Sequence, residues 1–481
     1  MKYASKSLER AIKFFARKEV LFLLFLVVLT VITMFRMDMP AGEDFYYHSR
    51  IAGQILQGNI FYDDLSYGGR FILPTLGLEL IIAILSFITS LSIKTISLLL
   101  PILFGLGSFL ILYSMLKRLN KIILVLGFLF ILISPGFLYL FTRLSVYSAV
   151  VFFTLLSIYF LSKNYSKLSI ASFVLVLFIS FSGGVISLFI ILIYCAYIRD
   201  LRAWLKFFVA GALFSLIYVP FLIKFGIPEI QEFPLGSKGI NFIFQRYFFD
   251  FGSKFGLAVF SFLLSFFGIS KLLKDKESHL VEYVSFVGLF ILAYFFDAAL
   301  FFLLFFASIL AAYGFITLLR KRWQSYTIKY VTLLIFIYGL LFSGTSYVNQ
   351  SINELPDKPI VDGLTYLESL DGRDAVFSYY TNGAWINAIA GKKNVMDSNF
   401  FYAPSLNNRW QDSQRILYSL DIEEISWLFD SYKIRYVFLD PYMKEELFES
   451  RDIGLVYVLK YSNKFKRLYN KNGVEVWEYA R

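Results

Sequence analysis

The sequence has few charged residues and almost no cysteine. Of its 481 residues, 17% are charged and 58% are hydrophobic, whereas an average soluble domain has about 25% charged and about 45–50% apolar residues. Water is therefore not the main solvent of this chain. The single cysteine, Cys195, lies within an apolar segment, which excludes a disulfide framework and a thiol pair. No internal repeat and no low-complexity tract stands out.

Long apolar runs are what the sequence has in abundance. Runs such as 20–35, 95–116 and 327–342 are about as long as a helix must be to cross a hydrocarbon core of ~30 Å. The net charge of +11 comes from Lys and Arg clusters in short segments between these runs. Such clusters are typical of cytoplasmic loops and do not indicate nucleic-acid binding. We predict an α-helical polytopic membrane protein with no nucleic-acid partner.

The basic clusters also predict the topology. A basic N-terminal segment precedes the run 20–35, which has no cleavage site at its end and reads as an uncleaved signal anchor with a cytoplasmic N-terminus. Residues 36–94 then form a first external loop, whose apolar stretch 71–91 reads as an interfacial or re-entrant helix. If that stretch crossed the membrane, the cluster at 117–121 would lie outside. Further spans are predicted at about 95–116, 122–134, 144–161, 168–182, 185–198, 204–223, 254–273, 280–296, 299–318 and 328–344.

This threading gives about eleven crossings, a mid-chain external loop at 224–253, and an external C-terminal end. From residue 345 onward Asp, Asn, Lys and Glu become frequent and the apolar residues come in short blocks. Three blocks read as strands and two segments have helical spacing: Ala375–Tyr379, Tyr436–Leu439 and Val474–Tyr479, and Gly383–Ala390 and Ile422–Tyr432. We therefore divide the chain into a transmembrane domain, 1–344, and a small extracytoplasmic α/β domain, 345–481.

The densest polar segment outside the predicted membrane is GEDFYYHSR, residues 42–50. Glu43 and Asp44 are adjacent carboxylates, and either could take the proton of an attacking hydroxyl or amide, or bind a divalent cation. His48, one of only two histidines, and Arg50 could contact a phosphate. The alternative is an ordinary solvated loop with an acidic helix cap.

A second segment, NIFYDDLSYGGR at 59–70, precedes the external apolar helix, and SPGF at 134–137 ends an outward span. With the acidic segment, the mid-chain loop and the external C-terminal domain, this order resembles the GT-C glycosyltransferases, particularly the catalytic subunit of oligosaccharyltransferase and its archaeal relatives. The resemblance implies a sugar donor on polyprenyl phosphate or pyrophosphate, used outside the cytoplasm. It also implies that Asp44, with Glu43 beside it, is the catalytic or metal-binding carboxylate.

Three positions depart from the oligosaccharyltransferase pattern. Oligosaccharyltransferases carry a second acidic pair in the next external loop, and residues 141–148 contain no carboxylate. This departure favours an enzyme without a cofactor; the alternative is a divalent cation, Mn²⁺ or Mg²⁺, with Asp44 as its ligand. The family also has a Trp-Trp-Asp motif after the first strand of its C-terminal domain, where this chain has YYTNG at 379–383. The family's arginine near the outer end of a late span is replaced here by Asp297. These departures favour a polyprenyl (dolichyl) monophosphate donor. The acceptor would be a lipid-linked glycan, another lipid or a protein hydroxyl, deprotonated by Asp44.

A lipid phosphate in an apolar setting needs cationic partners. The predicted substrate- and phosphate-binding residues are Tyr47, His48, Arg50, Arg70, Arg143 and Arg246. Arg246 could instead anchor at lipid headgroups, and Asp297 could be a turn residue. Glu229 and Glu232 in the mid-chain loop are either a mobile acidic segment or solvated. Glu79, an acid inside an apolar helix, should face a wet cavity or a cation.

Three other functions stay open from the sequence. They are oligosaccharide transfer to protein, transport of lipid-linked sugars by a flippase, and a non-catalytic membrane scaffold. A flippase would need ionisable or broken-helix sites near the bilayer midplane, and the spans contain few charges. A scaffold leaves Glu43 and Asp44 without a role. The expected partners are a polyprenyl-phosphate-linked sugar, a glycan or protein acceptor, and membrane lipids.

Overall fold

The computed structural model describes residues 40, 42–59, 62–72, 75–225, 240–272, 280–353, 355–400, 403–449 and 451–480. The predicted first span, the two glutamates of the mid-chain loop and the second histidine of the sequence, His279, lie outside these ranges. The chain divides into two compact units. Residues 1–40 and 94–353 form the helical unit, and residues 41–93 and 354–481 form the α/β unit. The first external loop therefore belongs to the same compact unit as the C-terminal residues.

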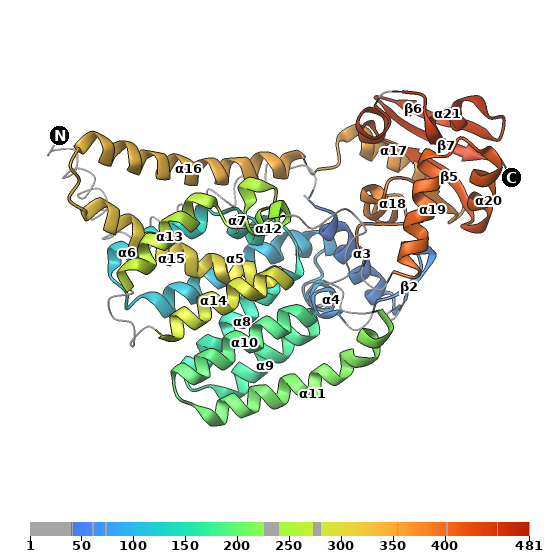
Figure 1. Ribbon diagram of the computed structural model, residues 1–481. Helices are drawn as coiled ribbons and strands as arrows, with labels where there is room; N and C mark the ends of the chain where they lie inside the picture. The colour runs from blue at the N-terminus through green and yellow to red at the C-terminus, as the bar shows by residue number, and fades with distance from the viewer. Residues whose placement is uncertain are drawn as a thin grey trace. The chain divides into compact units, whose positions relative to one another are not determined.

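The helical unit is built from twelve labelled helices within the described ranges (Figure 1). They are α5 (Ile93–Leu116), α6 (Lys121–Ile133), α7 (Pro135–Thr142), α8 (Val146–Ser162), α9 (Ser166–Ile179), α10 (Phe181–Tyr197), α11 (Leu201–Phe225), α12 (Ile240–Tyr247), α13 (Val259–Leu272), α14 (Leu280–Phe295), α15 (Ala298–Arg320) and α16 (Tyr326–Asn353). Each predicted span from 95 onward coincides with a helix. The last of them, α16, continues beyond the predicted domain boundary at 344.

Helix length and composition identify this chain as a helical membrane protein. Among the described residues, α5, α11, α15 and α16 are each long and apolar enough to span a bilayer. The pair α6 and α7 is bent by 66° and could count as a fifth span. The bend falls at Ser134, where the Pro135 ring cannot continue the preceding helix and the Ser134 hydroxyl caps the next one. Because α8, α9, α10, α13 and α14 are shorter, the eleven crossings stay a prediction.

Glycines permit the closest helix packing in this unit. A Cβ placed on Gly268 of α13 would lie 2.0 Å from the carbonyl oxygen of Leu310 in α15. One placed on Gly314 of α15 would lie 2.0 Å from the carbonyl oxygen of Leu264 in α13. Only a residue without a side chain fits at either position, so the two backbones touch directly, as is common between membrane helices.

The α/β unit contains a five-stranded sheet of order β4-β3-β5-β7-β6. The strands are β3 (Ala375–Phe377), β4 (Lys393–Asn394), β5 (Ile434–Leu439), β6 (Phe465–Lys471) and β7 (Val474–Tyr479). β4, β3 and β5 run parallel, and β7 is antiparallel to both β5 and β6. The three predicted strands are therefore confirmed, and so are the two predicted helices, as α18 (Gly383–Ala388) and α20 (Ile422–Ser431).

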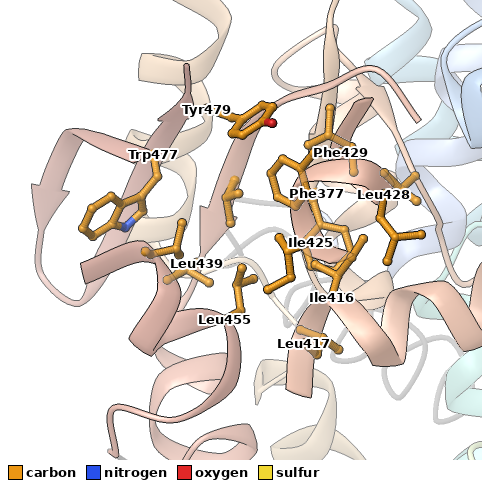
Figure 2. Packing of buried hydrophobic residues seen from close by; sticks show 14 of the residues in the cluster. Phe377, Ile416, Leu417, Ile425, Leu428, Phe429, Leu439, Leu455, Trp477 and Tyr479 are labelled. Carbon is orange, nitrogen blue, oxygen red and sulfur yellow. The ribbon is translucent and has the colours of Figure 1, made fainter. Parts of the chain in front are cut away.

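Both faces of this sheet are covered by helices. Alternate residues of each central strand point to opposite sides and therefore belong to two different clusters. Val376, Phe438 and Val476 belong to the cluster that includes residues of α17 (Lys358–Ser369) and α18. Phe377, Leu439 and Trp477 belong to the cluster on the other face. There they pack with residues of α19 (Leu406–Tyr418), α20 and α21 (Gly454–Tyr461), as Figure 2 shows.

The first external loop forms two helices with a small hairpin between them. These elements are α3 (Glu43–Leu56), β1 (Tyr62–Asp63), a 3₁₀ turn (Ser66–Gly68), β2 (Arg70–Phe71) and α4 (Gly77–Thr89). α4 has 13 residues and belongs to the shorter apolar helices, so its interfacial position stays a prediction. One loop residue, Tyr67, is 1% exposed and belongs to the same core cluster as Phe377 and Phe429.

Candidate active site

The acidic pair occupies the first turn of α3. Gly42 precedes it with a φ of 87°, a left-handed conformation that suits glycine and lets the chain turn into the helix. Glu43 and Asp44 are half-buried and lie where the unpaired N–H groups and the positive end of the helix dipole favour negative charge. The same helix buries Phe45, His48 and Ile51, and His48 lies one turn after Asp44 on the same face. The two carboxylates are therefore held on a packed helix.

His48 is paired with the acid of the apolar helix. Its Nδ1 lies 2.7 Å from Oε1 of Glu79 in α4, and both side chains are buried. Burial lowers the pKa of His48, but the charge and hydrogen bond of Glu79, with a smaller contribution from Asp44, outweigh it and leave the pKa raised. The partner that an acid in an apolar helix requires is thus His48.

Arg50 forms a two-pronged ion pair with an aspartate that the sequence analysis did not single out. Its two terminal nitrogens donate to the two oxygens of Asp63 at 2.6 and 2.7 Å. Asp63 is fully buried and also accepts hydrogen bonds from the backbone N–H groups of Leu65 and Ser66. Burial raises the pKa of Asp63, but Arg50 and Arg70 together lower it below its usual value. This pair fixes the hairpin against α3.

Arg70 lies at the centre of a buried charged network and is 3% exposed. It lies 3.9 Å from Asp63 and 3.8 Å from Asp397, which follows β4, and it donates to the carbonyl of Asn399 at 2.5 Å. Its guanidinium also lies 5.1 Å from the ring centre of Tyr47. Two arginines and two aspartates thus balance their charges inside the unit, as buried charges must.

Tyr67 joins the hairpin to the loop that follows β4. Its hydroxyl donates to the carbonyl of Asp397 at 2.7 Å, and its backbone N–H donates to the side-chain oxygen of Asn394 at 2.8 Å. The Ser66 hydroxyl donates to the Asp397 carboxylate, and the N–H of Asn394 donates to the carbonyl of Leu65. Tyr67 has a φ of 55°, a strained value that persists only where surrounding contacts hold it.

The helical unit holds the other two predicted arginines. Arg143 is 3% exposed, donates to the Ser351 hydroxyl at 3.3 Å and packs over the rings of Tyr139 and Tyr347. Arg246, on α12, lies 3.1 Å from Asp297 at the start of α15 and donates to the carbonyl of Ala293. Asp297 is therefore an ion-pair partner. Phosphate binding by any of the six predicted residues stays a prediction.

The described residues contain no group of three or more His, Cys, Asp or Glu side chains placed to hold a metal ion. A divalent cation on Asp44 therefore stays a prediction that depends on ligands from the substrate. A donor phosphate would supply such oxygens, which hard cations prefer.

Comparison with known proteins supports the fold assignment. No protein-family model and no curated protein matches the sequence. Among solved structures, the Archaeoglobus fulgidus oligosaccharyltransferase in the apo form matches with a TM-score of 0.61 and 13% identity, over 95% of this chain and 74% of that one. ArnT from Cupriavidus metallidurans in the apo state matches with a TM-score of 0.56 and 11% identity, over 96% of this chain and 98% of that one. The chain has the fold of the GT-C glycosyltransferases.

Two further GT-C structures were solved with bound molecules. The archaeal oligosaccharyltransferase AglB from A. fulgidus, in complex with an inhibitory peptide and a dolichol-phosphate, has a TM-score of 0.60 at 13% identity, over 95% of this chain and 74% of that one. ArnT bound to undecaprenyl phosphate has a TM-score of 0.51 at 13% identity, over 96% of this chain and 98% of that one. The resemblance noted in the first external loop is confirmed at the level of the fold.

Sequence reasoning missed the residues that hold this GT-C loop in place: Asp63, Tyr67, Asn394 and Asp397. Asp63 and Tyr67 lie within the segment that carried the resemblance, so a signal for them existed. Asn394 and Asp397 are more than 320 positions away from their partners in the loop. Only the folded chain brings them together.

Proposed function

We propose that this chain is a membrane glycosyltransferase that moves a sugar from a polyprenyl (dolichyl) phosphate donor to a lipid-linked glycan or another acceptor on the extracytoplasmic face. The observation that carries the proposal is the acidic first turn of α3, held by buried ion pairs within a GT-C fold. Asp44 is the proposed base, with Glu43 beside it.

The proposed reaction is a single displacement. The acceptor oxygen attacks the anomeric carbon, a new carbon–oxygen bond forms there, and the bond to the lipid phosphate breaks. Asp44 takes the proton that the acceptor oxygen loses, and the phosphate leaves with the bonding electron pair. A base of this kind contributes roughly 10²–10⁴-fold to a rate if it is held within hydrogen-bond reach of the proton.

Rigid support of the acidic turn favours this role. α3 is fixed through His48 to α4 and through Arg50 to the hairpin, and the hairpin is fixed through Tyr67 to the loop after β4. Reacting groups need placement to within about 0.5 Å, which only locked surroundings provide. Arg50 and Arg70 act in this proposal as positioning residues, because their charges are matched by Asp63 and Asp397.

The helical unit offers a place for the donor lipid. At the start of α15, Arg246 and Lys254 both interact electrostatically with Asp297, so two cations face one acid. An apolar cavity of about 630 Å³ extends along α15, with Phe302, Phe305 and Tyr313 in its lining. Phe302 is five residues from Asp297, or about 7.5 Å along a helix. A phosphate at the cations and an isoprenoid chain in the cavity would fit this arrangement.

Transfer assays with the purified full-length chain test the proposal. The donor is a labelled polyprenyl-phosphate sugar, and the acceptors are lipid-linked glycans in one set and a peptide with an Asn-X-Thr sequon in another. We expect transfer to a glycan, and Asp44→Asn should reduce it about 10²–10⁴-fold, while Glu43→Gln is the matched control with a smaller loss. Full activity of Asp44→Asn would refute the mechanism.

Two further arms of this assay separate the alternatives. Transfer to the sequon peptide alone would indicate an oligosaccharyltransferase. Movement of the labelled lipid across a vesicle membrane, without transfer to any acceptor, would indicate a flippase. The metal question is separate, because one A. fulgidus oligosaccharyltransferase structure contains Zn and sulfate. Activity that EDTA removes and Mn²⁺ restores would show that a cation takes part.

A further inference from the structure

Five aromatic side chains form a continuous patch in the α/β unit. Tyr380 is central, with ring centres 4.5 Å from Tyr379, 5.7 Å from Trp410 and 5.8 Å from Phe400. Tyr442 lies 5.8 Å from Tyr379 on the other side. These residues come from the segment after β3, the segment before α19, α19 itself and the segment after β5. We call this set of five the aromatic patch.

The patch lies at the carboxyl edge of the parallel strands. Tyr379 and Tyr380 follow β3, and Tyr442 follows β5, which is paired in parallel with β3. β4, the third parallel strand, ends at Asn394, and Asp397 follows it; both residues bind the first external loop. Open α/β sheets bind ligands at this edge, where the loops after parallel strands converge.

The patch is partly open to solvent: four of its rings pack with one side against the core cluster around Phe377 and Phe429, and the fifth, Tyr442, is exposed. Tyr442 is 50% exposed, whereas Phe377 and Phe429 in the core beneath are 0% exposed. The other four rings are half-buried. Isolated exposed aromatic rings are ordinary, but rings that touch one another and remain open are typical of binding surfaces.

The acidic turn of α3 borders the patch. Burial is the main reason why the pKa of Tyr380 is raised, and the nearby charge of Glu43 raises it further. Glu43 is therefore the residue of the acidic turn that lies near the central ring of the patch. α18, which begins directly after Tyr380–Asn382, also packs against α3.

We infer that the aromatic patch binds the sugar rings of the acceptor, and that the acceptor is therefore a glycan. This inference rests on the proposed glycosyltransferase function. The C–H face of a pyranose is apolar and matches an aromatic ring, and the phenolic hydroxyls of three tyrosines can pair with sugar hydroxyls. Neutral, hydroxyl-bearing rings suit an uncharged carbohydrate.

Binding is measured with full-length protein in lipid nanodiscs, without any donor. The probes are methyl glycosides of gluco-, galacto- and manno-configured disaccharides, a sequon peptide, and nanodiscs that differ in headgroup. Saturation-transfer NMR reports contact between aromatic protons and the C–H protons of the sugar. We expect at least one glycoside to bind, and Tyr442→Ala and Trp410→Ala to weaken its affinity about three- to tenfold.

Control variants separate the patch from a general loss of structure. Tyr442→Phe keeps the ring and should retain binding close to that of the unmodified protein. Trp427→Ala removes a tryptophan of α20 that is 66% exposed and outside the patch, and it should have no effect. Absence of binding by every glycoside would overturn the inference. The inference would also be overturned if the sequon peptide bound and no glycoside did, or if Tyr442→Ala removed binding to a lipid headgroup. An equal loss of glycoside affinity in Trp427→Ala would overturn it too.

The failure of this inference is distinguishable from the failure of the proposed function. The binding assay includes no donor and no transfer step, so it measures glycoside binding independently of sugar transfer. If glycosides bind at the patch but no donor sugar is transferred, the transferase proposal fails and the glycan site remains. If transfer occurs but Tyr442→Ala leaves the KM for the glycan acceptor unchanged, the patch has no role in acceptor binding and the inference fails.

Discussion

Removal of the Tyr67 side chain should detach the hairpin of the first external loop from the C-terminal part of the chain. Tyr67 is 1% exposed, packs in the core cluster around Phe377 and Phe429, and donates to the carbonyl of Asp397. Among the described residues, Tyr67 is the one member of the first external loop in this cluster. The contacts between loop and sheet should therefore depend strongly on this one ring.

The structure allows the size of the effect to be worked out. Truncation of a buried aromatic ring to alanine costs about 3–5 kcal/mol, whereas Tyr67→Phe removes only one hydrogen bond, worth about 0.5–1.5 kcal/mol. Each 1.4 kcal/mol is tenfold in an opening equilibrium. Tyr67→Ala should therefore raise local opening by more than about a hundredfold, and Tyr67→Phe by about two- to tenfold.

Hydrogen–deuterium exchange measured by mass spectrometry provides the assay. The backbone N–H of Asn394 donates to Leu65, so peptides covering 392–399 should exchange faster in Tyr67→Ala, together with peptides covering 62–71. Tyr461→Ala is the control, since that tyrosine is 66% exposed on α21. Unchanged exchange at 392–399 in Tyr67→Ala, or an equal change in Tyr461→Ala, would refute the reasoning.

Three further predictions concern the charged pairs. The pKa of Asp63 is lowered in the folded chain, so its ionised form stabilises the fold at pH values above the usual carboxyl pKa of about 4. This stabilisation is lost as the pH falls through the lower pKa of the folded state. Asp63→Asn should therefore flatten the acid side of a plot of unfolding free energy against pH. The raised pKa of His48 contributes stability below about pH 6.5 that is lost as the pH rises through the folded value. His48→Ala leaves Glu79 buried without its partner and should lower the free energy of unfolding, measured with denaturant, by about 3–5 kcal/mol. A decrease below about 1 kcal/mol would contradict this prediction. Asp297→Asn should tighten binding of polyprenyl phosphate severalfold and Arg246→Met should weaken it, because Asp297 competes with the phosphate for Arg246; the same direction in both variants would exclude the proposed site.

The roles of the arginines show how the structure alters interpretations made from residue type. Arg50 and Arg70 were predicted to bind phosphate because a lipid phosphate in an apolar setting needs cationic partners. In the folded chain each lies against buried aspartates, Arg50 on Asp63 and Arg70 between Asp63 and Asp397. A buried guanidinium without such partners would be costly. Positioning of the acidic turn is therefore the role that their contacts favour.

The α/β unit also shows which strands a sequence can indicate. β3, β5 and β7 are blocks of apolar residues, and their hydrophobic pattern predicts them. β6 has the sequence FKRLYNK, with mostly polar residues at the sheet edge, and was not predicted. Its signal was the Asn472-Gly473 pair before β7, a turn in which both residues have positive φ and which is typical of a hairpin. β4 has only two residues and carries no usable pattern.

The sequence by itself determined that this chain is a helical membrane protein with a small α/β domain and an acidic segment after its first apolar run. Apolar length, basic clusters and strand periodicity are local properties, so they can be read along the chain. The tertiary structure decided that the first external loop and the C-terminal sheet are one compact unit. It also decided that Asp63, Asp397 and Tyr67 support the acidic turn, and that five aromatic rings meet beside it. These facts depend on residues hundreds of positions apart, and a single sequence carries no local pattern that pairs them.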